Sequence, residues 1–171
     1  MLDNPDCIVE LDVTEATARL PELSEILVDA VAGGASVSFM PPFTQTDAMA
    51  YWSGLLPKVA AQQMILLAAL RNDRAVGTVQ LHLATPPNQP HRAEVAKLLV
   101  HQTARQQGIA KALLQKLEIV ARQHDRTLLT LDTLTGSVAE QLYLSLGYCR
   151  AGVIPGYAYL PTGELKDTAV F

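Results

Sequence analysis

The sequence predicts an α/β fold with a single mixed, mostly antiparallel and twisted sheet of about six to seven strands, covered by helices on both faces. Two apolar segments in the first half of the chain, residues 64–70 and 79–83, have the length and composition of paired strands. Later segments alternate between strand-like and helix-like patterns, which is typical of parallel strands joined by a helix. We therefore expect a ligand where the central parallel strands end and diverge.

The length predicts one domain, spanning residues 1–171, with a sizeable core. Hydrophobic residues make up 49% of the chain, and the formal net charge is −4 without a basic tract, so neither nucleic acid nor an anionic membrane is expected as a partner. Residues 1–6 carry acidic side chains where a signal peptide needs a basic region, and no apolar run reaches membrane-spanning length. We expect a cytoplasmic protein, either a monomer or a homodimer.

The cysteines and histidines predict neither a disulfide nor a metal site. Cys7 and Cys149 lie far apart in the sequence and beside strand-like apolar residues, which favours buried, reduced thiols. The four histidines form no pair four residues apart and have no cysteine or carboxylate at ligand spacing.

The N-terminal part of the chain predicts a strand, a helix and a connector. The strand covers residues 7–13, and the helix covers 23–31, where apolar residues recur at helical spacing until Gly33 and Gly34 end it. The irregular apolar segment 35–43 is expected over the substrate side of the fold, although a connector packed on the core fits it equally well.

A second helix is expected after Thr44 or Thr46, either of which can cap it. Its apolar face consists of Met49, Trp52, Leu56 and Val59. Pro57 is expected to bend or end this helix, because proline has no backbone N–H to donate. Tyr51 and Trp52 could line a ligand pocket as an aromatic pair, but core packing is the better interpretation.

The middle of the chain predicts a hairpin and a returning strand. Residues 64–70 form a continuous apolar run, typical of a buried strand, and residues 79–83 alternate as a half-exposed strand does. Residues 71–74 join them as a turn. After the proline-rich loop 85–90, residues 93–100 form the strand that leads into the central motif.

The second half predicts two helices and three further strands. A long amphipathic helix begins at Ile109 and ends at residues 124–126. A strand at residues 127–131 leads to Asp132, and a helix at 137–146 ends at Gly147. The last two strands are expected at residues 148–154 and 165–171, with turns at 155–156 and 161–163.

Residues 97–111 have the pattern of a strand, a phosphate-binding loop and the start of a helix. A helix start leaves its first backbone N–H groups unpaired and carries the positive end of the helix dipole, so a loop that wraps there attracts a phosphate. Gly108 and Ala110 keep that approach open, because a bulky side chain at either position would hold a pyrophosphate away from the amides. The loop lacks the ending of a nucleotide-hydrolysing P-loop and the three glycines of a dinucleotide fingerprint.

At this loop the sequence resembles the GNAT superfamily of acyl-CoA-dependent N-acetyltransferases, whose signature is Arg/Gln-x-x-Gly-x-Gly/Ala between a splayed strand and a helix. The resemblance continues with Ser137 at a helix cap, Tyr143 inside that helix and the Leu-Gly-Tyr exit at residues 146–148. It implies a GNAT-like fold with splayed parallel strands, and acetyl-CoA as a co-substrate without a metal. The implied coenzyme-binding residues are Leu98, Leu99, Val100, Arg105, Gln106, Gln107, Gly108, Ile109, Ala110, Lys111, Ser137 and Tyr143.

Acetyl transfer to an amine requires a neutral amine, a stabilised thioester oxygen and a proton for the departing thiolate. Tyr143 is the expected general acid, because it can donate to the thiolate and recover its proton from solvent. A bulge in the strand at residues 98–100 is expected to direct one backbone N–H to the oxygen. Glu94 and Asp132 are both candidate bases, since the two carboxylates can converge at the opening of the sheet.

Each catalytic candidate also has a structural interpretation. Tyr143 can pack its helix, Glu94 can form a surface ion pair and Asp132 can cap the turn that follows it. Cys149 is the only cysteine near the expected site in sequence, and we interpret it as a core residue rather than a nucleophile.

Within the superfamily, the sequence is similar over most of its length to a member that acetylates a β-lactam amino-acid toxin. In that member a glutamate, an aspartate and a tyrosine at the positions of Glu94, Asp132 and Tyr143 lie at the reaction centre. The resemblance implies direct transfer, in a ternary complex, to an amine of a small, polar, amino-acid-like acceptor. Two alternatives are an acetyltransferase for protein N-termini or lysines and a non-catalytic regulator that binds acyl-CoA.

Overall fold

The computed structural model describes residues 7–171 of the chain. Residues 1–6, whose acidic side chains contributed to the expectation of a cytoplasmic protein, lie outside this range. Within it, no helix is both long enough and apolar enough to cross a membrane. The described residues form an α/β fold with mostly antiparallel strands, as the sequence predicts.

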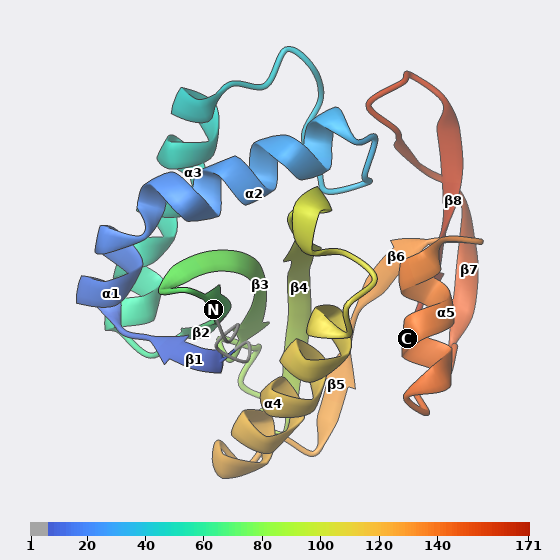
Figure 1. The fold of residues 1–171 in the computed structure, drawn as a ribbon. Coiled ribbons are helices and arrows are strands. Elements are labelled where there is room, and N and C mark those ends of the chain that lie inside the picture. Colours follow the sequence, from blue (N-terminus) through green and yellow to red (C-terminus); the bar gives the residue numbers. More distant parts are fainter. Residues whose placement is uncertain (1–6) are drawn as a thin grey trace.

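Five strands form the larger sheet: β1 (Cys7–Leu11), β2 (Met64–Arg71), β3 (Arg74–His82), β4 (Arg92–Val100) and β5 (Leu128–Thr130). They lie across the sheet in chain order (Figure 1). Neighbouring strands are antiparallel except for β4 and β5, which run parallel. The β2–β3 turn consists of Asn72 and Asp73, both at positive φ, the backbone conformation that a tight hairpin requires.

The predicted single sheet is divided in two, because the chain changes its pairing partner at Leu131. The Leu131 N–H donates to the carbonyl oxygen of Phe171 at 3.0 Å, and the Phe171 N–H donates back at 2.9 Å. From there β6 (Asp132–Leu134) pairs with β8 (Leu165–Val170), which also pairs with β7 (Gly152–Tyr159). The predicted strand 127–131 therefore corresponds to β5 alone, and the next three residues form β6 in the second sheet.

Helices cover both faces of the larger sheet, as predicted. They are α1 (Val13–Ala18), α2 (Leu20–Ala32), α3 (Gln45–Ala60), α4 (Ile109–Gln123) and α5 (Val138–Ser145). Helices α1 to α3 lie on one face, α4 lies on the other, and α5 packs beside the smaller sheet (Figure 1). Side chains of β2 alternate between the two resulting cores: Leu66 packs with α2 and α3, whereas Leu67 packs with α4.

Helix α3 begins as predicted but does not end at Pro57. Thr44 is its N-cap: the hydroxyl accepts a hydrogen bond from the Asp47 N–H, and the Asp47 carboxylate accepts one from the Thr44 N–H at 2.8 Å. Pro57 removes one intrahelical hydrogen bond, yet the last turn still forms, since the Pro57 carbonyl oxygen accepts from the Ala61 N–H at 3.0 Å.

Two other predictions were wrong in detail. Residues 12–13 do not continue the first strand, because the Asp12 carboxylate caps α1 by accepting from the Glu15 N–H at 2.8 Å. Residues 155–156 are not a turn between strands but lie inside β7. The strand bulges there, and the Gly156 N–H donates to the carboxylate of Asp167 at 2.8 Å.

Both cysteines are free, but they are exposed rather than buried as predicted. Cys7 opens β1, which is an edge strand of the larger sheet, and Cys149 precedes β7. Cys7 is the first residue of its strand, where a single residue can face solvent while its neighbours are covered. Cys149 and its neighbour Tyr148 lie in the loop between α5 and β7 rather than in a strand.

Candidate active site

A cleft of about 310 Å³ opens where β4 and β5 diverge. The parallel pairing covers only three residue pairs and ends with Glu94 opposite Thr130, after which the second chain segment turns toward β8. The cleft is lined by the connector at residues 35–38, by β4 at 94–99, by β6 and by the first turns of α5. Residues 35–38 of the connector border the cleft, as expected of a segment on the substrate side. Phe39 packs on the core, so the alternative interpretation, a connector packed on the core, also describes part of the segment.

A β-bulge shapes the wall of the cleft that β4 provides. Thr78 of β3 lies opposite Leu99 and Gln80 lies opposite Ala96, so Lys97 and Leu98 have no paired residue in β3. Lys97 has φ +50°, a conformation that few side chains adopt outside a turn or bulge. A bulge interrupts the ladder of hydrogen bonds and can turn a backbone N–H and a side chain toward a ligand.

Tyr143 of α5 forms the far wall of the cleft. Its side chain is 5% exposed, and its ring packs against those of Tyr148 and Phe171 at centroid distances of 5.5 and 5.9 Å. No other described residue forms a hydrogen bond with its hydroxyl. Burial, reinforced by the negative charge of Asp132, raises the pKa of Tyr143 to about 12, so the phenol stays protonated at neutral pH.

The two carboxylates predicted as alternative bases line the same cleft. Glu94 is the last residue of β4 that pairs with β5, and it lies opposite His82 of β3. Asp132 opens β6, and its Oδ2 accepts a hydrogen bond from the Thr168 hydroxyl at 3.3 Å. Both side chains are exposed to the cleft and its mouth, where they can exchange protons with solvent. The structure therefore brings Glu94, Asp132 and Tyr143 to one site.

Lys97 also lines this cleft, although sequence reasoning assigned it no role. Its ammonium lies 5.6 Å from the ring centroid of Phe39 and 5.9 Å from that of Tyr51. Burial lowers the pKa of Lys97, and the negative charges of Asp132 and Glu94 oppose that shift. The signal that could have found it is a lysine with apolar residues on both sides, in the half of the strand that leads into the binding loop.

Polar side chains of β3 lie on the face of the sheet that α3 covers. Gln80 is fully buried; its Nε2 donates to the Tyr51 hydroxyl at 3.0 Å, and its Oε1 lies 2.9 Å from Nε2 of His82. Burial lowers the pKa of His82, with Glu94 opposing the shift and the positive charges of Lys58 and Lys97 adding to it. These effects favour the neutral form of the His82 imidazole.

The loop before α4 presents the helix start that the motif predicts. Gly108 is the N-cap with φ +82°, and it provides no side-chain cap. Among residues 7–171, no acceptor lies in hydrogen-bond contact with the backbone N–H groups of Gln107, Gly108, Ile109 or Ala110. A Cβ added at Gly108 would meet nothing within 4 Å, so the approach to these amides is open. This geometry suits a phosphate.

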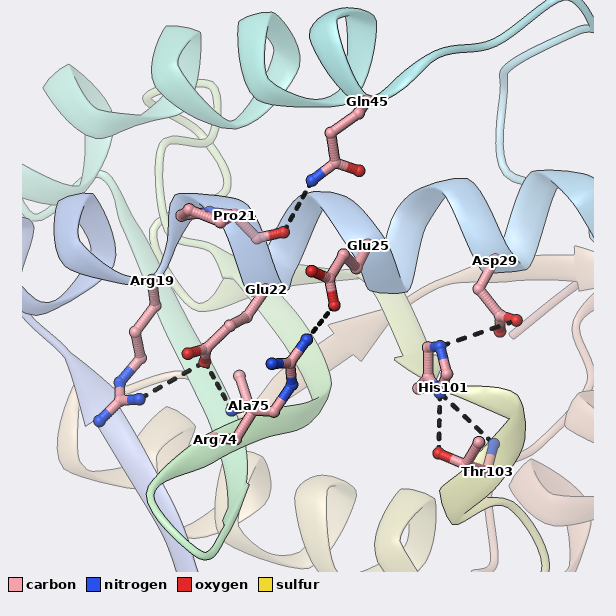
Figure 2. A network of polar contacts seen from close by, with 10 residues as sticks. All are labelled: Arg19, Pro21, Glu22, Glu25, Asp29, Gln45, Arg74, Ala75, His101 and Thr103. Atoms are coloured by element: carbon pink, nitrogen blue, oxygen red, sulfur yellow. Dashed lines mark hydrogen bonds and ion pairs between the residues drawn. The ribbon is translucent and has the colours of Figure 1, made fainter.

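The side chain of Arg105 is held away from that helix start. Its guanidinium donates to the carboxylate of Asp29 in α2 at 2.7 Å and to the carbonyl oxygen of Val100 at 2.9 Å. Figure 2 shows the same carboxylate facing His101, whose ring is in turn hydrogen-bonded to Thr103 in the short 3₁₀ helix η1 (Gln102–Ala104). Arg105 thus fixes the loop between β4 and α4 onto α2.

The other predicted coenzyme-binding residues divide between the cleft and the loop. Leu98, Leu99 and Ser137 line the cleft with Tyr143, and the Ser137 hydroxyl caps α5 by accepting from the Glu140 N–H at 3.1 Å. Ile109 is 3% exposed, so its side chain belongs to the core and only its amide can face a ligand. The remaining predicted residues lie outside the cleft lining, at the end of β4, in the loop and in the first turn of α4: Val100, Gln106, Gln107, Ala110 and Lys111.

Within residues 7–171, no group of three or more histidine, cysteine, aspartate or glutamate side chains is arranged to hold a metal ion. The ionisable groups that line the cleft come from Tyr143, Glu94, Asp132 and Lys97. These are a protonated phenol, two carboxylates and an ammonium, next to a helix start with open amides. Such a set can hold a phosphate-bearing ligand, remove a proton from an amine and supply one to a leaving group.

A family model described as the acetyltransferase (GNAT) family matches residues 29–148 of this chain. The matched stretch extends from the end of α2 through α5, and so includes β4, the loop before α4 and all three predicted catalytic residues. Both walls of the cleft are therefore within the match.

Solved structures share the fold over nearly the whole chain. The N-acetyltransferase of Staphylococcus aureus Mu50 has a TM-score of 0.79 at 19% identity, covering 98% of this chain and 96% of its own. The ribosomal-protein-alanine N-acetyltransferase of Brucella melitensis has a TM-score of 0.78 at 22% identity, covering 96% of each chain. The protein yncA of Salmonella typhimurium, solved with its cofactor acetyl-CoA, has a TM-score of 0.77 at 17% identity, covering 98% of this chain and 92% of its own.

Proposed function

The chain belongs to the acetyltransferase (GNAT) family, and we propose that it moves the acetyl group of acetyl-CoA to an amine of a small, polar, amino-acid-like acceptor. It is an acyl-CoA-dependent N-acetyltransferase. The observation that carries the proposal is the meeting of Tyr143, Glu94 and Asp132 in one cleft beside the bulged strand β4.

The residues before and within α4 fit the diphosphate of the coenzyme. The amides around Gly108 have no partner among the described residues, and a Cβ at that position would meet open space. The start of α4 lies against β3 beside the end of β4, since a Cβ at Gly77 of β3 would lie 3.1 Å from both Ile109 Cγ2 and the Leu99 carbonyl oxygen. A diphosphate at this helix start therefore leaves the thioester arm free to follow β4 into the cleft.

In the proposed reaction, different residues of the chain remove a proton from the amine, stabilise the thioester oxygen and assist the departing thiolate. Bound acetyl-CoA supplies the acetyl group as a thioester. Glu94 or Asp132 takes the proton from the ammonium group of the acceptor, directly or through a water, and so creates a neutral amine. The backbone N–H of Leu98, in the bulge, donates a hydrogen bond to the thioester oxygen as its charge develops.

Tyr143 serves the departing thiolate. Its pKa of about 12 keeps the phenol protonated, whereas a free thiol has a pKa near 8.5. Tyr143 therefore acts mainly by donating a hydrogen bond to the thiolate, which recovers its proton from solvent. Transfer is direct, without a covalent enzyme intermediate, in keeping with two free cysteines that both lie outside the cleft lining, Cys7 and Cys149.

The amino-acid-like acceptor is supported by the resemblance to one member of the family, the tabtoxin resistance protein. The similar stretches include residues 33–40, 92–95 and 136–140, and the first of these contributes the connector that borders the cleft. A cleft of about 310 Å³ is at the small end of ligand sites, which span about 300–1,000 Å³. Its size favours a small acceptor over a folded protein.

A thiol-release assay tests the proposal. The purified protein is incubated with acetyl-CoA and a panel of amino acids, amino sugars and amine antibiotics, and the free thiol is measured. We expect release that depends on the acceptor. Release that is equal with and without every acceptor would contradict the assignment.

Substitution of Tyr143 separates an enzyme from a regulator that only binds acyl-CoA. In Tyr143→Phe we expect turnover to fall by roughly 10- to 1,000-fold while the affinity for coenzyme, measured by titration calorimetry, changes little. Tyr148→Phe is the matched control, because this tyrosine is half-buried and packs against the Tyr143 ring but does not line the cleft. Unchanged turnover in Tyr143→Phe would remove Tyr143 from the mechanism.

A further inference from the structure

Lys97 is turned into the cleft by the bulge in β4. In a regular strand Lys97 would share a face with Val95, which packs in the core against α4. Its ammonium instead lies beside Phe39 of the connector and Tyr51 of α3, on the opposite face of the sheet. The strained backbone of Lys97, with φ +50°, therefore places a positive charge at the site.

This positive charge has no direct counter-ion in the described part of the chain. No carboxylate among residues 7–171 lies within 4.0 Å of Lys97 Nζ, and its one hydrogen-bond partner is the Ser38 hydroxyl oxygen at 3.5 Å. The two aromatic rings stabilise a cation only in part. An ammonium removed from water is unfavourable unless an anion compensates it. Asp132 and Glu94 act on Lys97 only from beyond 4.0 Å, so a direct position beside the ammonium is left for an anionic group of a ligand.

The cleft is divided by charge. Lys97 lies toward the connector and α3, whereas Glu94 and Asp132 border the opening between β4 and β6. A molecule with an ammonium and a carboxylate close together matches this division, because each of its charges then faces the opposite charge. An amine without an anionic group would leave Lys97 uncompensated.

We propose that Lys97 binds an anionic group of the acceptor, such as the carboxylate of an amino acid, and that it selects acceptors in which this group lies close to the amine. The inference rests on the proposed acetyl transfer for the identity of the amine, but the binding of the anion can be measured without any transfer. Ser38, which is within hydrogen-bond distance of Lys97, is the second contact available to the anion.

The experiment compares amino acids with their amides, which keep the amine and replace the carboxylate by a neutral group. Wild type, Lys97→Met and Lys97→Arg are assayed with each matched pair, and kcat/KM is measured at saturating acetyl-CoA. Loss of one charge-assisted contact predicts that Lys97→Met lowers kcat/KM for the amino acid roughly 10- to 100-fold and changes that for the amide by less than about threefold. Lys97→Arg is expected to retain most of the preference.

Lys58→Met is the charge-matched control, since Lys58 is an exposed lysine of α3 outside the cleft lining. It should leave the preference for the amino acid unchanged. An equal loss for both members of each pair in Lys97→Met would overturn the inference and would mean that Lys97 serves the catalytic carboxylates instead. Equal use of amino acids and amides by the wild type would overturn it as well.

Calorimetry distinguishes failure of this inference from failure of the proposed function. The amino acids and amides are titrated into wild type and Lys97→Met in the presence of coenzyme A. Binding of the amino acid that depends on Lys97, without any transfer, would contradict the proposed reaction and support the role of Lys97. Acetyl transfer together with amino-acid binding that is unchanged in Lys97→Met would support the proposed reaction and contradict the role of Lys97.

Discussion

The carboxylate of Asp29 accepts a hydrogen bond from the guanidinium of Arg105 at 2.7 Å, and so joins helix α2 to the loop that leads into α4. The same carboxylate accepts from the backbone N–H of Gln102 at 3.0 Å and faces the ring of His101 at 4.0 Å. Only 10% of the Asp29 side chain is exposed. One buried carboxylate therefore anchors the loop on which the amides of the helix start depend.

Replacing Asp29 by alanine should loosen this loop. The change removes two hydrogen bonds to a buried charge, so we expect the free energy of unfolding to fall by about 2–3 kcal/mol. We also expect the affinity for acetyl-CoA to fall roughly tenfold, because the amides around Gly108 would have to be ordered on binding. Urea unfolding and titration calorimetry measure the two effects.

Glu25→Ala is the control on the same face of α2, one turn earlier (Figure 2). Glu25 forms an ion pair with Arg74, and both side chains are about half exposed. The expected loss is below about 1 kcal/mol, with no change in coenzyme affinity. If Asp29→Ala left coenzyme binding equal to that of Glu25→Ala, the anchoring role would be wrong.

The pattern of apolar residues predicted most elements because their burial is decided locally. Residues 64–70 lie in the centre of the sheet with both faces covered, so a continuous apolar run was a reliable signal. Thr44 was one of two predicted caps for α3, and the structure selects it over Thr46 because its partner Asp47 lies within the same turn. The division of the sheet at Leu131 was missed, since it depends on pairing with Phe171 at the other end of the chain.

The candidate site shows the same limit. Glu94, Asp132 and Tyr143 were selected from the sequence and line one cleft, while their catalytic roles stay predictions. A bulge was predicted at residues 98–100, and the pairing with β3 places it at Lys97 and Leu98. Lys97 was given no role, because regular alternation of side chains along the strand would turn it toward the core. Asp29 and Arg105 lie far apart in the sequence, so no spacing rule could predict that the guanidinium of Arg105 would bind the carboxylate of Asp29.

Gly108→Ala tests the helix start itself. An alanine at φ +82° is strained, and the expected loss of stability is about 1–2 kcal/mol. The strain falls on the amides that we propose bind the diphosphate, so affinity for acetyl-CoA should fall at least several-fold. Gly163→Ala is the matched control, because Gly163 has φ +85° with nothing within 4 Å of its Cβ position and lies in the β7–β8 turn. Equal coenzyme affinity in the two variants would contradict the proposed site.

Gly77→Ala tests how closely α4 must approach the sheet. A Cβ at Gly77 would lie 3.1 Å from Ile109 Cγ2 and from the carbonyl oxygen of Leu99, and 3.3 Å from Leu113 Cδ1. Overpacking of this kind costs about 1–3 kcal/mol, and the displaced start of α4 should also weaken coenzyme binding. Gly54→Ala, at an exposed position of α3 with open space around it, should instead stabilise the protein by about 0.5–1 kcal/mol. If both changes stabilised the protein, α4 could move away from the sheet without loss of stability, and its close approach would not be required.

Tyr143 should make the protein less stable at high pH. Its pKa is raised from 10.0 to about 12, so above pH 10 the unfolded chain loses this proton while the folded chain keeps it. The contribution is fully present below pH 10 and is lost as the pH rises to 12; at about 1.4 kcal/mol for each pKa unit, it amounts to about 3 kcal/mol. Urea unfolding followed through Trp52, the single tryptophan and 1% exposed, measures it.

The variant Tyr143→Phe should lose less stability between pH 9 and pH 11.5 than the wild type does, because phenylalanine has no proton to release. The difference between the two proteins isolates Tyr143 from the other groups that titrate in this range, including Tyr148, whose pKa burial also raises. Tyr157→Phe removes a hydroxyl from a side chain that is 53% exposed, and should follow the wild type. Parallel curves for wild type and Tyr143→Phe would mean that the phenol ionises as readily in the fold as in water, and would contradict the raised pKa.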